Sequence, residues 1–158
     1  MIKVGDQIPA HKLTAATSDG PREMTTEEVF AAKTVVLFAV PGAFTPTCSA
    51  RHLPGYIENM DALRAKGVDT VACTAVNDVF VLDAWAKAGG VEGILMLADG
   101  SGTFARALGL ELDLQARGLG MRSQRYAMVV RDGQVAHLAV EAPGGFEVST
   151  ADAVLKAL

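Results

Sequence analysis

Short apolar runs alternate with segments of helical periodicity over the first two thirds of the chain, and no other feature constrains the fold as strongly. Thr34–Val40 is a continuous run of β-branched, aliphatic and aromatic residues, which is typical of a strand buried on both faces. Val68–Val76 and Ile94–Ala98 are further runs of this kind, and the segments between them predict helices over Ser49–Lys66 and Asp78–Ala88. Strands that alternate with helices indicate an α/β protein with a largely parallel sheet and helices on both faces.

The last third of the chain adds an antiparallel pair to this sheet. Asp132-Gly133 lies between the runs Arg125–Val130 and Val135–Val140, and this dipeptide is typical of a tight hairpin turn. Residues 111–123 are glycine-bearing and expected to be irregular, and residues 1–32 are expected to form a mixed opening with several turns. Shorter helices are predicted at three places: Thr26–Ala32, Thr103–Leu108 and Thr150–Leu158. We therefore expect a mixed central sheet, for which the thioredoxin-like fold is one of several matching layouts.

The helix predicted over Ser49–Lys66 contains a proline in its first half. Apolar residues recur at helical spacing along this segment, and Gly67 follows it as a typical C-terminal residue. Pro54 lacks an N–H group, and in a regular helix its ring clashes with the carbonyl group of Ala50. We therefore expect a kink in the helix close to Pro54.

Length and composition exclude several classes of protein. The chain has 158 residues, which fits one domain over residues 1–158, and 50% of its residues are hydrophobic. Its net charge of −4 argues against nucleic-acid binding. No apolar run is long enough to span a membrane, and the first residues, Met1–Asp6, do not resemble a signal peptide. With two cysteines the chain is not a disulfide scaffold, so we expect a cytoplasmic protein without nucleic-acid or membrane partners.

One of the two cysteines lies where functional groups gather in α/β proteins. Cys48 follows the buried run Thr34–Val40 and precedes the helix predicted from Ser49. Open α/β sheets place their sites beyond the carboxyl ends of strands. The thiolate is the reactive form of cysteine, and free N–H groups in the first turn of a helix stabilise an anion. Position alone is equally compatible with a small side chain packed under a loop.

The residues around Cys48 form a recognisable motif. The spacing Pro41-x-x-x-Thr45-x-x-Cys48 resembles the peroxidatic-site motif of the peroxiredoxins. The longer string Pro41-Gly-Ala-Phe-Thr-Pro-Thr-Cys48-Ser-Ala-Arg-His52-Leu-Pro-Gly-Tyr56 is similar to the type II, or peroxiredoxin-5-like, branch of that family. The resemblance covers nearly the whole chain in order, and it continues at further places: Val71–Asp78, Trp85, Leu97–Gly100 and Arg125–Gly133.

The resemblance implies a fold, an activity and a set of site residues. The fold is thioredoxin-like, and the activity is thiol-dependent reduction of hydrogen peroxide and organic hydroperoxides, without a metal or other cofactor. Cys48 would be the peroxidatic nucleophile, Thr45 would hydrogen-bond the peroxide and the thiolate, and Pro41 would shield the sulfur from water. Arg125 would hold the thiolate and polarise the peroxide. Fixed donors suit this reaction because negative charge moves from sulfur onto the departing oxygen.

Other polar residues near the motif have simpler interpretations. Arg122 is a rival to Arg125 as the cation of the site, but we expect it to be a solvated side chain. His52 lies four residues after Cys48 on the same predicted helix. A metal site needs three or four ligands, so we expect His52 to make a local polar contact. Cys73, in a run of small residues, is expected to be a buried and unreactive thiol.

The cysteine content and the resemblance together imply a catalytic cycle and an assembly. Some peroxiredoxin-5-like proteins carry a resolving cysteine near the C-terminus, but the matching stretch here, Gly144–Thr150, has none. A one-cysteine mechanism is therefore expected, in which glutathione with glutaredoxin, or thioredoxin, recycles the sulfenic acid of Cys48. The charged fraction of 20% and the resemblance also predict a homodimer, with Phe44 and Phe80 as candidate contact residues.

Three functions other than that of a peroxidase are alternatives for this sequence. A peroxide sensor that passes oxidation from Cys48 to a partner protein would carry the same residues, and only turnover with a thiol separates the two functions. A disulfide oxidoreductase is disfavoured, because Thr45 and Arg51 occupy the positions at which a CxxC pair would place a second thiol. A non-enzymatic module is disfavoured because Pro41, Thr45, Cys48 and Arg125 are all present.

Overall fold

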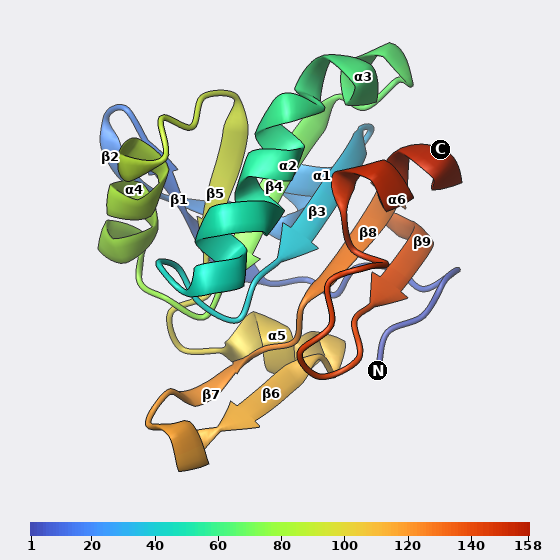
Figure 1. Ribbon diagram of the computed structural model, residues 1–158. Helices are drawn as coiled ribbons and strands as arrows, with labels where there is room; N and C mark the ends of the chain where they lie inside the picture. Colours follow the sequence, from blue (N-terminus) through green and yellow to red (C-terminus); the bar gives the residue numbers. More distant parts are fainter.

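Seven strands form one mixed sheet in the order β2-β1-β5-β4-β3-β8-β9 (Figure 1). The structure is a computed structural model that describes residues 1–158. The three central strands are parallel, and they are β3 (Thr34–Ala39), β4 (Thr70–Ala75) and β5 (Ile94–Ala98). The outer strands run antiparallel to their neighbours: β1 (Lys12–Thr17), β2 (Gly20–Thr25), β8 (Tyr126–Arg131) and β9 (Gln134–Val140). The predicted mixed sheet is confirmed.

Helices cover both faces of the sheet, as the alternation predicted. Val36 and Phe38 of β3 pack under one layer, which contains α2 (Leu53–Glu58), α3 (Met60–Ala65), α4 (Val79–Ala88) and α6 (Ala151–Ala157). Val35 and Leu37 pack on the opposite face, which is covered by α1 (Thr26–Phe30) and α5 (Thr103–Leu108). All four β3 side chains are fully buried, which explains the unbroken apolar run. The longest helix, α4, has ten residues, and no helix is long and apolar enough to cross a membrane.

The segment after β3 is broken into three pieces, where a single kinked helix was predicted. A π-helical turn, Cys48–His52, comes first, and the N–H group of Leu53 donates to the carbonyl of Cys48 five residues earlier. This wide turn directly precedes Pro54, which has no N–H group to continue a regular helix. α2 then ends at Asn59, whose side-chain amide donates to the carbonyl of Gly55 at 2.7 Å and so competes with the backbone of the helix.

Two hairpins were missed by the sequence analysis. β1 and β2 form the first of them, in the opening segment for which only turns and a short helix were predicted. β6 (Glu111–Leu114) and β7 (Gly120–Ser123) form the second, in the segment expected to lack structure. The prediction was wrong because β2 is a polar edge strand with one proline, and the other pair has four residues per strand. Such strands carry little of the period-two apolar pattern on which the prediction depends.

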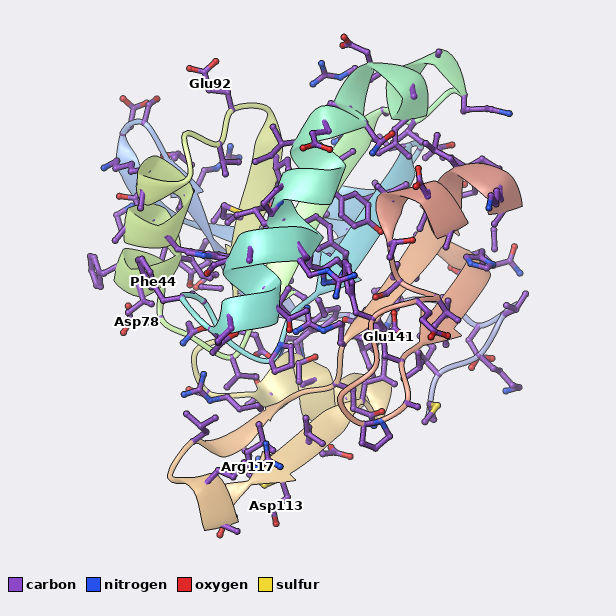
Figure 2. The ribbon with its side chains drawn as sticks, viewed as in Figure 1. Phe44, Asp78, Glu92, Asp113, Arg117 and Glu141 are labelled. Carbon is purple, nitrogen blue, oxygen red and sulfur yellow. The ribbon has the colours of Figure 1, made fainter.

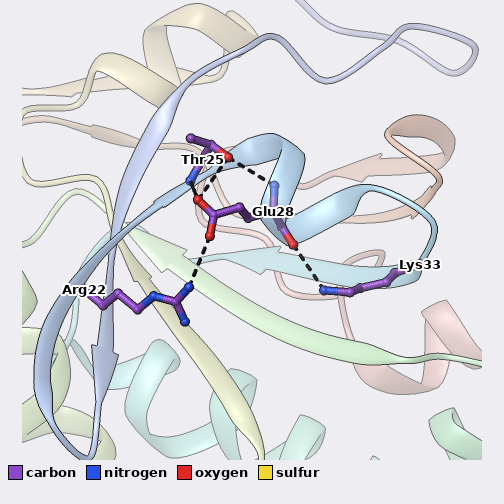
Figure 3. A network of polar contacts seen from close by, with 4 residues as sticks. All are labelled: Arg22, Thr25, Glu28 and Lys33. Carbon is purple, nitrogen blue, oxygen red and sulfur yellow. Dashed lines mark hydrogen bonds and ion pairs between the residues drawn. The ribbon is translucent and has the colours of Figure 1, made fainter.

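Local sequence signals hold the short helix α1 in place. Thr25 accepts a hydrogen bond from the N–H group of Glu28, and the Glu28 carboxylate accepts one from the N–H group of Thr25 (Figure 3). This reciprocal capping box satisfies free N–H groups at the start of the helix. Arg22 pairs with the same carboxylate at 3.2 Å, and the ammonium group of Lys33 donates to the carbonyl of Glu28. A helix of only five residues is thereby fixed against the sheet.

The predicted turn at Asp132-Gly133 is present. Arg131 pairs with Gln134, so the hairpin has a two-residue loop, and both loop residues have positive φ angles, 48° and 77°. This is the geometry that Asp-Gly favours. Because β8 runs antiparallel to β3, the start of β8 lies beside the end of β3, where Ala39 pairs with Tyr126. The turn therefore delivers the residue just before Tyr126 to the carboxyl end of the central strand.

Candidate active site

A tight loop leads from the end of β3 to Cys48. The backbone N–H and the hydroxyl of Thr45 both donate to the carbonyl of Gly42, the hydroxyl at 2.6 Å. Phe44, inside this turn, has a φ angle of 64°, a left-handed conformation that aromatic residues seldom adopt. The N–H group of Ala43 donates to the side chain of Asn77 at 2.9 Å, which ties the loop to the residues after β4. Helical structure begins at residue 46, so Cys48 lies close to its start, as predicted.

Arg125 makes direct contact with the sulfur of Cys48. Its Nη2 donates to Cys48 Sγ at 3.1 Å, and its Nη1 donates to Nδ1 of His52 at 2.8 Å. Arg125 immediately precedes β8, which explains how a residue so distant in the chain reaches the loop after β3. Cys48 is fully buried, so the guanidinium group lies beside a sulfur that is shielded from bulk water. A permanent cation in such surroundings stabilises a thiolate strongly.

His52 links Arg125 to Ser149 through the two nitrogens of its ring. A guanidinium group only donates and a carbonyl only accepts, so Nδ1 of His52 accepts from Arg125 while Nε2–H donates to the carbonyl of Ser149 at 3.0 Å. Burial lowers the pKa of His52 to about 4, and the charge of Arg125 lowers it further, although the bond to Ser149 opposes both effects. His52 is therefore neutral at pH 7. The expected local polar contact is present, but its partner Arg125 was not foreseen.

Arg122 lies at the edge of the site and does not touch the sulfur. Its Nε donates to the carbonyl of Leu119 at 2.7 Å, and its Nη1 donates to the carbonyl of Pro41 at 3.3 Å. The side chain is half-buried and bonds two carbonyl groups, so it is less solvated than expected, although it is not the cation that contacts the sulfur. The hairpin β6–β7 carries this arginine toward the loop that follows β3, and no hairpin was predicted for these residues. Arg122 thus secures the loop, while Arg125 contacts Cys48.

A small cavity opens beside these groups. Its volume is about 120 Å³, and Pro41, Thr47 and Arg125 are among its lining residues. Leu112, Gln124 and the segment 141–145 complete the lining. A water molecule takes up roughly 30 Å³ in the liquid, so the cavity has room for a hydrogen peroxide molecule. Pro41 and Arg125 are thus brought to one cavity, whereas Cys48 and Thr45 are not among its lining residues, and Cys48 meets it only through its contact with Arg125. The hydroxyl of Thr45 does not bond to Sγ, because it donates to the carbonyl of Gly42.

The second thiol lies in the core. Cys73 is fully buried in β4, where it pairs with Phe38 of β3 and Met96 of β5. Burial raises its pKa well above the ordinary value, and the proximity of Cys48 adds to the effect. Both cysteines are free thiols. The prediction of a buried thiol at Cys73 is confirmed.

Known proteins share this fold and this sequence. The Redoxin family model matches residues 3–155. Over 159 residues the chain is 46% identical to Peroxiredoxin-2B of Arabidopsis thaliana, which covers 99% of this chain and 98% of that protein. The solved structure of reduced Prx3 from Vibrio vulnificus in complex with H₂O₂ is 54% identical, covers 99% of both chains and superposes with a TM-score of 0.96.

A more distant structure points to the same branch. Peroxiredoxin 5 from Alvinella pompejana is 37% identical, covers 99% of this chain and 97% of its own, and has a TM-score of 0.88. These similarities confirm the thioredoxin-like fold that the motif around Cys48 implied. The chain belongs to the redoxin family and, within it, is a peroxiredoxin of the type II, peroxiredoxin-5-like branch, a thiol-dependent peroxidase.

Proposed function

We propose that Cys48 is the peroxidatic nucleophile of this enzyme. The observation that carries the proposal is the 3.1 Å contact between Arg125 Nη2 and Cys48 Sγ, made by an arginine that also lines a small cavity. The thiolate attacks one peroxide oxygen, an S–O bond forms and the O–O bond breaks. The departing oxygen takes both electrons of that bond and a proton, and leaves as water or an alcohol. Cys48 is left as a sulfenic acid, oxidised by two electrons.

The neighbouring residues have separate roles in this step. Arg125 holds the thiolate and faces the charge that develops on the departing oxygen. The hydroxyl proton of Thr45 is directed at the carbonyl of Gly42, so its oxygen lone pairs are free to accept the O–H group of the peroxide. Pro41 forms a wall of the cavity and excludes water from the sulfur. Together these groups position the peroxide in line with Sγ.

An external thiol completes the proposed cycle. Cys73 lies within the sheet and carries a raised pKa, so it is a poor partner for the sulfenic acid. Cys48 is also fully buried, so a thiol larger than a peroxide reaches the sulfur only when the turn Cys48–His52 opens. The π-helical geometry of this turn and the proline that follows favour such an opening, because both weaken a regular helix. Glutathione with glutaredoxin, or thioredoxin, is the proposed reductant.

Peroxide consumption tests this function directly. The enzyme is assayed with hydrogen peroxide in two parallel systems, glutathione with glutaredoxin and thioredoxin with its reductase. Steady-state turnover in at least one system, lost in Cys48→Ser, is the expected result. A single round of oxidation without turnover in either system would favour a peroxide sensor instead.

Replacement of Thr45 by valine is expected to slow the reaction with peroxide. Valine keeps the shape of threonine but removes the oxygen that would accept from the peroxide, and one missing donor or acceptor of this kind costs about 10²-fold in rate. The second-order rate constant for oxidation of Cys48 is measured by stopped-flow fluorescence, with the fold checked by circular dichroism. Thr45→Ser, which keeps the hydroxyl, is the matched control and should retain most of the rate. An unaltered rate in Thr45→Val would restrict Thr45 to closing the loop.

A homodimer is the proposed assembly. Phe44 and Phe80 are 55% and 72% exposed, and they come from two adjoining segments, since the loop of Phe44 is tied to Asn77 and Phe44 lies near Asp78 (Figure 2). Two exposed aromatic side chains of this kind are typical of an interface. Light scattering at micromolar concentration should give about 33 kDa, twice the chain mass of 16.5 kDa.

Phe80→Glu should reduce that mass to 16.5 kDa, because a charge at the centre of an apolar interface opposes association. Val4→Glu, at another exposed apolar residue, should leave it unchanged. A mass of 16.5 kDa for the unmodified protein would refute the dimer at that concentration.

A further inference from the structure

A buried carboxylate lies directly across the sheet from Arg125. The N–H group of Glu141 donates to the carbonyl of Arg125 at 2.9 Å, which continues the β8–β9 ladder beyond the pair Tyr126 and Val140. Glu141 is 8% exposed and lies at the cavity, beside the loop that leads to α6 (Figure 2). Residues opposite one another in an antiparallel pair place their side chains on the same face. Even so, Glu141 forms no ion pair with Arg125.

The carboxylate of Glu141 is instead enclosed by its own loop. The N–H group of Glu147 donates to both carboxylate oxygens, at 3.0 Å and 2.9 Å. Ser149 donates twice to Oε2, from its backbone N–H at 2.7 Å and from its hydroxyl at 2.6 Å. A Cβ atom on Gly145 would lie 3.0 Å from the carbonyl oxygen of Ala142 and 3.3 Å from Oε1, so the loop packs tightly at this glycine. Burial alone would raise the pKa of Glu141, but these hydrogen bonds lower it below its ordinary value.

The same loop supports His52 from behind. The carbonyl of Ser149 accepts from Nε2 of His52 at 3.0 Å and from the hydroxyl of Tyr56 at 2.8 Å. Ser149 is fully buried, and its N–H, hydroxyl and carbonyl groups all take part in these bonds. A continuous series of hydrogen bonds therefore runs from Glu141 through Ser149 and His52 to Arg125.

The arrangement also keeps Arg125 available to the sulfur. A carboxylate beside an arginine ordinarily forms a bidentate ion pair, which would turn the guanidinium group away from a thiolate. Here the loop amides and the Ser149 hydroxyl occupy the carboxylate oxygens, and the partner of Arg125 on the other side is a neutral imidazole. The positive charge of Arg125 is therefore left to Cys48 and to the peroxide.

We propose that Glu141 is a positioning residue of the peroxidase site, which sets the orientation of Arg125 through Ser149 and His52. The proposal rests on the function proposed above for Arg125. If the loop around Glu141 loosened, His52 could move. Arg125 would then lose the orientation in which its guanidinium group contacts Cys48 Sγ. A displacement of about 1 Å at a reacting centre costs up to about 10²-fold in rate, so a defect far from the sulfur is measurable.

The test compares two reactions of Cys48 in the variant Glu141→Gln. Glutamine keeps one oxygen to accept from Ser149, but it loses the charge and turns an amide NH₂ group toward the N–H group of Glu147, so the enclosure is weakened. We expect the rate constant with hydrogen peroxide to fall by about tenfold or more. Alkylation by iodoacetamide is measured at alkaline pH, where a cysteine is ionised without help from Arg125, so its rate reports access to the sulfur and should be unchanged or higher. Glu147→Gln makes the same change of charge on an exposed side chain of the same loop, and both rates should be as in the unmodified enzyme.

Each outcome decides the proposal. An unaltered peroxide rate in Glu141→Gln overturns it, and so does an equal fall in both rates, which indicates general damage to the site.

Arg125→Met in the same assay distinguishes a failure of this proposal from a failure of the proposed function: if that variant also keeps its peroxide rate, the function proposed for Arg125 fails as well. If Glu141→Gln does not fold, Ser149→Ala decides, because it removes only the hydroxyl bond at 2.6 Å. A lower peroxide rate with unaltered alkylation supports the series of bonds, and an unaltered peroxide rate refutes it.

A second pair of variants checks the link at His52. Glutamine at this position keeps one donor for Ser149 and one acceptor for Arg125, whereas leucine keeps neither. His52→Gln should therefore retain most of the peroxide rate, and His52→Leu should lose about tenfold or more. Equal rates in the two variants would contradict a positioning role.

Discussion

Cys48→Ser is expected to abolish peroxide reduction, whereas Cys73→Ser keeps it when an external thiol is supplied. Serine at position 48 has no thiolate to attack the O–O bond, and no thiol lies among the residues that line the cavity. Cys73 is fully buried between its neighbouring strands and contributes to the core only. Peroxide consumption coupled to the thiol donor measures both variants.

Cys73→Ser is also expected to lower the stability of the protein. A serine hydroxyl at position 73 would be buried among apolar residues, which costs about 1–3 kcal/mol of unfolding free energy. Cys73→Ala avoids the buried hydroxyl and is the better control for activity. If Cys73→Ala turned over only once with an external thiol, Cys73 would be a resolving cysteine and the one-cysteine cycle would be wrong.

Arg125→Met is expected to reduce the rate with peroxide by about 10³-fold, the upper end of the range for one charge-stabilising group. Methionine fills similar space without a charge, so the thiolate loses its cation and the departing oxygen loses its donor. Stopped-flow oxidation of Cys48 gives the rate, and alkylation by iodoacetamide at several pH values gives the thiolate population. The oxidation rate and the thiolate population should both fall in this variant, because Arg125 stabilises the thiolate and also faces the departing oxygen.

Arg122→Met is the matched control for that experiment. Arg122 bonds the carbonyl groups of Pro41 and Leu119 and does not reach the sulfur. Its loss should loosen the loop and lower the rate much less than Arg125→Met does. A larger effect at Arg122 than at Arg125 would show that the assignment of the cation is wrong.

Part of this site could be predicted from neighbouring residues alone. The buried run Thr34–Val40 and the helix after it place Cys48 at the carboxyl end of a central strand. The Asp-Gly turn brings the chain back antiparallel, and that topology puts Arg125, rather than Arg122, beside the end of β3. The positions of Cys48 and Arg125 depend on local sequence signals and on the pairing of β8 with β3. The chemical roles of these two residues came from the resemblance to a family.

The support for Arg125 could not be predicted in the same way. His52 gave a weak signal, its helical spacing from Cys48, while Glu141 and Ser149 gave none, because their bonds join segments far apart in the chain. The π-helical turn was foreseen only as a kink at Pro54, since the way a helix accommodates a proline depends on its tertiary contacts. The hairpin that carries Arg122 has four residues per strand and too little apolar period to be recognised.

Mass spectrometry of the oxidised protein tests the central claim most directly. The reduced protein receives one equivalent of hydrogen peroxide without a thiol donor, in the presence of dimedone, which traps sulfenic acids. The account predicts one dimedone adduct, on the peptide that contains Cys48, with Cys73 still a free thiol. A disulfide between Cys48 and Cys73 as the main product, or an adduct on Cys73, would contradict it.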